Sequence, residues 1–338
     1  MANRYEIGTA TSLDDLIRTK LRNFATATLG YTDDEGTSAA GRQYLSRSGG
    51  GLSLFFSCRF DTGTPQNLGL YQALGYINAG TQPGNHTSDS GNGIVTSTNA
   101  TFVTGRSVVL ANTSMNYWFF GDGAASNYVH VVVEPTPGSG SFRHFGFGLL
   151  GKVGTWTGGE YCYGHRTATA GSVNVNNSYL LDGLNRASAA NPPFVATLHI
   201  ESLPLQVASG KWGVVWGDRN TARGNDRGGT AREAIQGGFR GGPVAFPFAK
   251  WGNTPSQGLV PLTPIWCFYT KDGGAGDDRC YPLGFMRDTR AININSYSGG
   301  DQISVGGDTW ILFPSEQKGT NTGASTGNQG IAYKLIAN

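Results

Sequence analysis

Glycine is the residue that most limits what this chain can fold into. The 338 residues include 52 glycines and 14 prolines, together roughly a fifth of the chain, whereas an average protein carries about 12%. Glycine raises the entropic cost of ordering a helix or strand, and proline removes a backbone hydrogen-bond donor. Aromatic residues nevertheless make up 11% of the chain and apolar residues 38%, which is typical of a folded core. We therefore expect short β-strands joined by many turns.

Runs of β-branched and aromatic residues, each ending in turn-forming residues, predict five strands. They lie at residues 52–60, 129–134, 194–200, 265–270 and 309–313. Long polar stretches at residues 80–101 and 293–307 predict wide loops. The expected fold class is mainly β: a glycine-rich antiparallel sandwich or barrel-like body over residues 31–338, with one N-terminal amphipathic helix. If the body has two subdomains, their boundary is expected near residues 160–195.

One segment has helical periodicity, and it lies within residues 1–30. Ser12 is a suitable N-cap, Asp15 completes a capping-box pattern and Gly30 follows as the C′ residue, so the helix is expected over residues 12–29. Its apolar residues recur at helical spacing and are Leu13, Leu16, Ile17, Leu21 and Phe24. Two alternatives remain open. The favoured one packs this face on the body of its own subunit, and the other makes Leu13, Leu16, Ile17 and Phe24 a docking arm toward a neighbouring subunit.

A second candidate contact surface is an arginine-rich stretch in the middle of the chain. Arg219, Arg223 and Arg227 recur every four residues among glycines, and the nearby acidic residues Asp218, Asp226 and Glu233 partly neutralise them. Such mixed charge is typical of a solvated loop or short charged helix. A subunit-contact surface is the alternative.

Charge and targeting signals exclude several classes of protein. The formal net charge is only +2, which favours neither nucleic acid nor anionic lipid as a partner. The first residues lack the pattern of a signal peptide, and no run of 18 apolar residues occurs, so we expect a chain made in the cytoplasm without membrane insertion. The cysteines lack metal-ligand spacing and are expected to be buried free thiols: Cys58, Cys162, Cys267 and Cys280.

The one nucleotide-binding pattern is the GxGxxG at residues 146–151. A dinucleotide site would require a helix to begin at these glycines, but residues 152–159 are too rich in glycine to form one. We expect the glycines to allow close backbone packing in a strand. The sequence contains no P-loop or HExxH motif. We therefore predict no catalytic residues, no cofactor and no metal.

Histidines and carboxylates are the remaining groups with possible chemistry. The histidines are isolated in sequence and are expected to be structural, although His144 and His165 could meet across a sheet in a metal site. Paired carboxylates for glycoside cleavage are assembled by tertiary structure, so Asp122, Glu134 and Glu160 stay candidates. Aromatic side chains beside them could stack on sugars or belong to a sheet core: Trp156, Tyr161 and Tyr163.

Three segments carry a resemblance to a known group of proteins. The most specific is residues 131–159, where a strand and a glycine turn precede RHFGFG and then WTGG. Residues 307–314 and 327–334 form the second match, and the helix opening at residues 8–16 the third. These segments resemble structural proteins of tailed bacteriophages.

The resemblance implies a non-enzymatic virion protein, made in the host bacterial cytoplasm. Its implied partners are other copies of itself in a ring and neighbouring neck or tail proteins. Neck or collar, as a head-to-tail component, is the first choice of position. The alternatives are a tail-tip or baseplate component, or a receptor-binding, tailspike-like protein that grips glycans.

Overall fold

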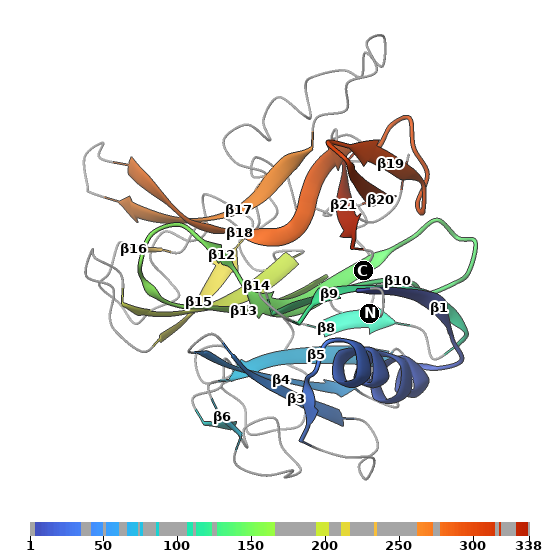
Figure 1. The fold of residues 1–338 in the computed structure, drawn as a ribbon, viewed down its shortest axis with the longest axis horizontal. Helices are drawn as coiled ribbons and strands as arrows, with labels where there is room; N and C mark the ends of the chain where they lie inside the picture. The colour runs from blue at the N-terminus through green and yellow to red at the C-terminus, as the bar shows by residue number, and fades with distance from the viewer. Residues whose placement is uncertain are drawn as a thin grey trace.

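Antiparallel β-sheets form most of the part of the chain that the structure describes, as predicted from the glycine content. The computed structural model describes residues 4–34, 42–49, 52–60, 66–73, 75–76, 86–87, 107–110, 113–123, 127–165, 194–202, 211–216, 233–234, 262–272, 278–314, 318 and 329–336. Three larger sheets lie one above another, with the helical segment beside the lowest (Figure 1).

The middle layer, here called the central sheet, has seven strands and supplies residues to two cores. In spatial order its strands are β1 (Tyr5–Ala10), β9 (Met115–Asp122), β10 (Tyr128–Glu134), β11 (Arg143–Leu149), β13 (Thr157–His165), β14 (Phe194–Ser202) and β15 (Lys211–Trp216).

The layer above it, the C-terminal sheet, comes mostly from the last third of the chain. Its order is β16 (Glu233–Ala234), β17 (Thr263–Asp272), β18 (Asp278–Asn293), β21 (Gln329–Leu335), β20 (Asp308–Pro314) and β19 (Gln302–Val305), and β12 (Gly151–Lys152) also pairs with β18. The long β18 carries a bulge, because Pro264 pairs with Arg290 whereas Trp266 pairs with Phe285.

The layer below, the N-terminal sheet, covers the other face of the central sheet together with the helical segment. Its strands are β2 (Thr32–Asp33), β3 (Arg42–Gly49), β4 (Leu52–Phe60), β5 (Gln66–Ala73) and β8 (Ser107–Leu110), and β6 (Gly75–Tyr76) pairs separately with β7 (His86–Thr87).

The five predicted strands are confirmed as β4, β10, β14, β17 and β20, with ends shifted by at most two residues. One loop prediction is wrong in part, because the stretch 293–307 contains β19, which forms a hairpin with β20. Two glycines at its turn have positive φ, Gly306 at 63° and Gly307 at 86°, and they permit this tight reversal. Within 80–101 the structure describes β7 alone, and the rest lies outside the described residues.

Burial on both faces explains why β10 is a nearly continuous apolar run. All seven of its residues are buried, which is the pattern of a strand covered on both sides. Val129, Val131 and Val133 face the lower core, together with helical residues and the N-terminal sheet. Val132 faces the upper core, together with the C-terminal sheet. The central sheet therefore holds the three layers together.

The helix is confirmed in position, but its hydrogen bonding differs from the expected α pattern. Residues 13–28 are helical without a break and contain two π-helical stretches, η1 (Asp15–Leu21) and η2 (Phe24–Thr28). Ser12 does cap the start, since its Oγ accepts a hydrogen bond from Asp15 N at 3.0 Å. The Asp15 carboxylate, however, accepts from Thr11 N at 2.9 Å instead of from Ser12 N. Gly30 has φ 73°, as a C′ glycine requires.

The N-terminal segment is more than a helix, because residues 5–10 form β1 at one edge of the central sheet. The other proposed boundary, near residues 160–195, lies between β13 and β14. These two strands pair with each other. The described strands on the two sides of that stretch therefore belong to one sheet.

Candidate functional site

Histidine and tyrosine side chains gather between the central and C-terminal sheets, on the face of the central sheet opposite Val129, Val131 and Val133. Because strand side chains alternate, Tyr128 and His130 of β10 point to the same face as His144 of β11 and Tyr163 of β13. Tyr333 of β21 meets them from the C-terminal sheet, with its ring stacked on His144 at a centroid distance of 5.9 Å. We call these five residues the His–Tyr cluster. None of them is more than 1% exposed.

Both ring nitrogens of His130 are engaged. Tyr163 Oη lies 2.9 Å from Nδ1, and the backbone oxygen of Arg287 lies 3.1 Å from Nε2. A carbonyl oxygen can only accept a hydrogen bond, so Nε2 carries the proton and Nδ1 accepts from the tyrosine. The side chain therefore ties the central sheet to β18.

His144 repeats the same arrangement at a second point. Tyr333 Oη lies 2.8 Å from its Nδ1, and the backbone oxygen of Pro314 lies 2.8 Å from its Nε2. The same reasoning assigns the proton to Nε2. This histidine ties β11 to the ends of β20 and β21.

The bulge in β18 provides the acceptors on the C-terminal sheet. Asp288 adopts a left-handed conformation there, with φ 50°, and its Oδ2 accepts a hydrogen bond from Tyr128 Oη at 2.7 Å. Neighbouring Arg287 turns its carbonyl toward His130. A bulge frees backbone groups from the ladder and redirects side chains, and here both effects serve contacts with the central sheet.

Burial keeps the cluster uncharged. Desolvation lowers the pKa of His130 to about 3 and that of His144 to about 4, although the carbonyl bonds oppose the shift. Burial also raises the pKa of the Tyr128 and Tyr163 hydroxyls. A general base needs a proton-accepting atom within reach of a substrate, and both histidines are buried with their nitrogens occupied. The cluster is therefore suited to holding two sheets together.

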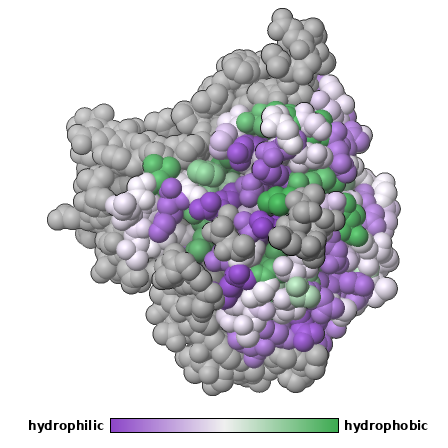
Figure 2. Space-filling model, viewed as in Figure 1, coloured by the Kyte–Doolittle hydropathy of each residue, from purple (hydrophilic) through white to green (hydrophobic). Residues whose placement is uncertain are grey.

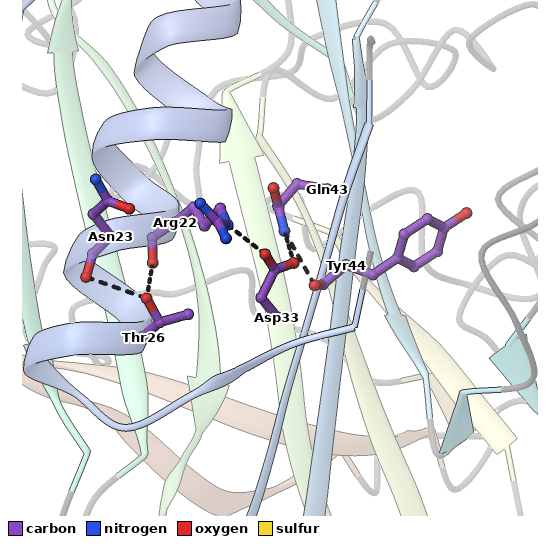
Figure 3. Close-up of polar contacts among 6 residues, drawn as sticks. All are labelled: Arg22, Asn23, Thr26, Asp33, Gln43 and Tyr44. Carbon is purple, nitrogen blue, oxygen red and sulfur yellow. Dashed lines mark hydrogen bonds and ion pairs between the residues drawn. The ribbon is translucent and has the colours of Figure 1, made fainter. Parts of the chain in front are cut away.

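A second polar network joins the helical segment to the N-terminal sheet (Figure 3). Arg22 pairs with the Asp33 carboxylate, and Gln43 Nε2 donates to the other oxygen of Asp33 at 2.7 Å. Thr26 Oγ1 donates to Arg22 O at 2.9 Å within the helix. Asp33 thus links the helical segment, at Arg22 between η1 and η2, to β3, which fixes the helix against the sheet.

The three candidate carboxylates are all buried, and they do not form a glycosidase pair. Asp122 and Glu134 lie at opposite ends of the β9–β10 hairpin, where Asp122 pairs with Tyr128. Six strand residues separate Tyr128 from Glu134, roughly 20 Å, while glycoside cleavage needs a separation of about 5 to 9.5 Å. Glu160 pairs with Leu149, whose side chain packs on the lower core, so it lies on the other face from Asp122.

The first two of these carboxylates have structural partners. Asp122 forms an ion pair with Arg4 at 2.9 Å. Glu134 accepts hydrogen bonds from Asn116 Nδ2 at 2.9 Å and from Gly140 N at 2.8 Å, which closes the turn between β10 and β11. Their charges are used to fix β1 and this turn.

The aromatic candidates for sugar stacking belong to the sheet core, which was the second of the two interpretations. Tyr161 and Tyr163 are fully buried, and Trp156 is 5% exposed. Trp156 Nε1 donates to Leu283 O at 3.1 Å, so the indole links β13 to β18.

The apolar interface candidates on the helix are buried within their own chain. Leu13, Leu16 and Ile17 have no exposed surface and Phe24 is 1% exposed. Phe24 packs on Phe119 of the central sheet, with ring centroids 5.5 Å apart. The docking-arm interpretation of these four side chains is therefore corrected, and the helix packs on its own subunit. The arginine candidates Arg219, Arg223 and Arg227 lie outside the described residues.

The glycine motif at residues 146–151 lies in β11 and β12, and the chain then continues through bends at residues 153–155 into β13, with no helix following the glycines. A Cβ on Gly146 would lie 2.7 Å from the Tyr163 ring, which confirms the expected close packing. Cys58 and Cys162 are buried free thiols, as predicted. Among the described residues no cluster of three histidine, cysteine or acidic side chains could hold a metal ion. No helix in that part of the chain is long and apolar enough to cross a membrane.

Sequence reasoning treated the histidines as structural but missed Tyr333, the partner of His144, and the contact between Tyr128 and Asp288. The two tyrosines occur in runs typical of an ordinary strand core. The available signal was the nearly continuous apolar character of residues 128–134, because a strand buried on both faces must satisfy its histidine internally.

A scan against protein-family models and a search of curated proteins each return no match for this chain.

Proposed function

We propose that the protein is a non-enzymatic structural component of a tailed-bacteriophage particle, present in several copies around the neck as a collar or head-to-tail component. The resemblance of residues 131–159, 307–314 and 327–334 to phage structural proteins is the origin of this proposal. In the described structure these segments correspond to β10 to β13, β20 and β21.

The observation that carries the proposal is that histidine and carboxylate side chains make structural contacts inside the fold. His130 and His144 bridge two sheets, Asp122 fixes β1, and Glu134 closes a turn. Among the described residues, these histidines and carboxylates are committed to internal contacts, which suits rigidity more than turnover. That property supports a particle component, which must keep its shape after assembly.

The experiment removes the gene and examines the particles that form. We expect particles to contain the chain by mass spectrometry when the gene is present, and to show heads separated from tails when it is deleted. A plasmid copy should restore both. Intact, infectious particles from the deletion would contradict the proposal.

The tail-tip and receptor-binding alternatives predict different outcomes of the same deletion. A tail-tip or baseplate component would leave heads joined to tails but with a defective tip. A receptor-binding protein would leave complete particles that no longer adsorb to the host. The burial of Trp156, Tyr161 and Tyr163 removes three candidate sugar-stacking residues, so we place the glycan-binding function second.

A further inference from the structure

The strand β1 forms one edge of the central sheet, and no strand among the described residues pairs with its outer side. Gly121 N donates to Arg4 O at 3.0 Å, and Tyr5 pairs with Phe120 in continuous register. Arg4 and Gly121 therefore form a hydrogen-bonded pair. Hydrogen-bonded and non-hydrogen-bonded pairs alternate in an antiparallel ladder, so the backbone groups of Glu6 and Gly8 point toward β9. The N–H and C=O groups of Tyr5, Ile7 and Thr9 point away from it.

This edge lacks the features that usually prevent strand addition. Natural edges are protected by lysine, proline, bulges or very short strands, whereas β1 has six residues, no lysine or proline and no break in register. Its one charged side chain, Glu6, accepts a hydrogen bond from Tyr117 Oη at 2.6 Å. Ile7, at the middle of the edge, is 49% exposed, the highest value among the large apolar residues that the structure describes.

We propose that β1 pairs antiparallel with β1 of a second copy of this chain, so that two central sheets join into one continuous sheet across a two-fold axis. With the axis at Ile7, the two Ile7 residues face each other and exchange both backbone hydrogen bonds. Tyr5 then faces Thr9 and Glu6 faces Gly8. No like charges meet, and the central pair is β-branched, which favours cross-strand packing.

Two copies of β1 can therefore pair with each other in a regular register and without repulsion between like charges. Two-fold contacts are the commonest between identical subunits, and a two-fold pair is a unit from which rings of even copy number are built. The inference rests on the proposed function in one respect, namely that copies of the chain meet in the particle. It adds which surface they use.

The test measures the mass of the purified full chain in solution by light scattering after size-exclusion chromatography, with Ile7→Lys as the variant. We expect the wild type to have twice the 35.7 kDa of the chain and Ile7→Lys to be monomeric, because two lysines would then face each other at the axis. The matched control is Val305→Lys, at a residue 40% exposed on the edge strand β19, and it should keep the dimer mass. Circular dichroism should be the same for all three proteins.

A second variant tests the register directly. Cα atoms of a hydrogen-bonded antiparallel pair lie about 5.5 Å apart, within the disulfide range of about 4.4 to 6.8 Å. Ile7→Cys should therefore form a covalent dimer when a mild oxidant takes up two electrons and two protons, and Val305→Cys should not. A monomeric wild type, or a dimer that Ile7→Lys leaves intact, would overturn the inference.

Failure of this inference and failure of the proposed function have different signatures. A chain that enters particles but never pairs through β1 refutes the edge contact alone. A chain that pairs through β1 but is absent from particles refutes the phage assignment alone.

Discussion

At the scale of single residues, the two buried histidines make the stability of the fold depend on pH. The folded pKa values of about 3 for His130 and about 4 for His144 lie below the ordinary value of 6.5. Between these values the unfolded chain binds protons that the folded chain does not, so stability rises with pH. The contribution of these neutral histidines to stability is fully present above about pH 6.5 and is lost as the pH falls toward 4.

We expect the free energy of unfolding to fall by roughly 3 kcal/mol per pH unit between pH 6 and pH 5, since each histidine contributes ~1.4 kcal/mol per unit. Urea unfolding at closely spaced pH values measures this slope. Replacing one histidine, as in His144→Gln, should reduce the slope by about half. A wild-type stability that does not change across this range would show that the histidines are not held neutral.

The tyrosine partners should matter for a separate reason. Tyr333→Phe keeps the ring but leaves His144 Nδ1 buried without its donor, and an unsatisfied buried polar group costs about 1 to 3 kcal/mol. Tyr297→Phe, at a half-buried position in the segment between β18 and β19, is the control and should change stability little. Equal effects of the two changes, measured by urea unfolding at pH 7.5, would contradict this role of the cluster.

At the scale of elements, the local sequence predicts which strands and helices form but does not predict which strands pair with each other. The five strand runs and the helix were predictable because burial and capping leave period-two and helical patterns along the chain. The pairing of β1 with β9 joins residues more than a hundred positions apart, and no local pattern records it. The π-helical bonding of η1 and η2 was also missed, since its apolar spacing resembles that of an α-helix.

The helix makes a direct test of packing. Leu16 and Phe24 are buried against the central and N-terminal sheets, so Leu16→Ala and Phe24→Ala should each cost about 2 to 5 kcal/mol. Thr19→Ala, on the exposed side of η1, should be nearly neutral. Thermal unfolding of the purified chain compares the three, and unchanged melting of the Leu16 and Phe24 variants would instead revive the docking-arm interpretation.

At the scale of the whole molecule, the two-sided central sheet explains how a glycine-rich chain with few charged residues keeps a defined shape. Figure 1 shows the three layers, and apolar residues fill both gaps between them. The His–Tyr cluster adds directional contacts between the central and C-terminal sheets, and the Asp33 network adds them between the helical segment and the N-terminal sheet. On the face drawn in Figure 2, hydrophobic residues lie among strongly hydrophilic ones. The fold class could be predicted from composition, but the three-layer order could not, because it depends on which faces of distant strands meet.

The candidate site was predictable only in part. The histidines were expected to be structural, and His130 and His144 are found in internal contacts. The carboxylates stayed open as candidates for glycoside cleavage, and Asp122 and Glu134 are found in internal contacts. The bulge at Arg287 and Asp288, which supplies the acceptors, follows from tertiary strand pairing and leaves no signal in local sequence.

The proposed position of this chain in the neck of a phage particle can be tested by electron cryo-microscopy of whole particles. We predict density for three stacked β-layers, repeated in a ring around the neck, into which the described strands fit without rearrangement. Density at the tail tip would refute the neck position in favour of the alternative. Particles that are complete at both ends and contain no density of this shape would contradict the account.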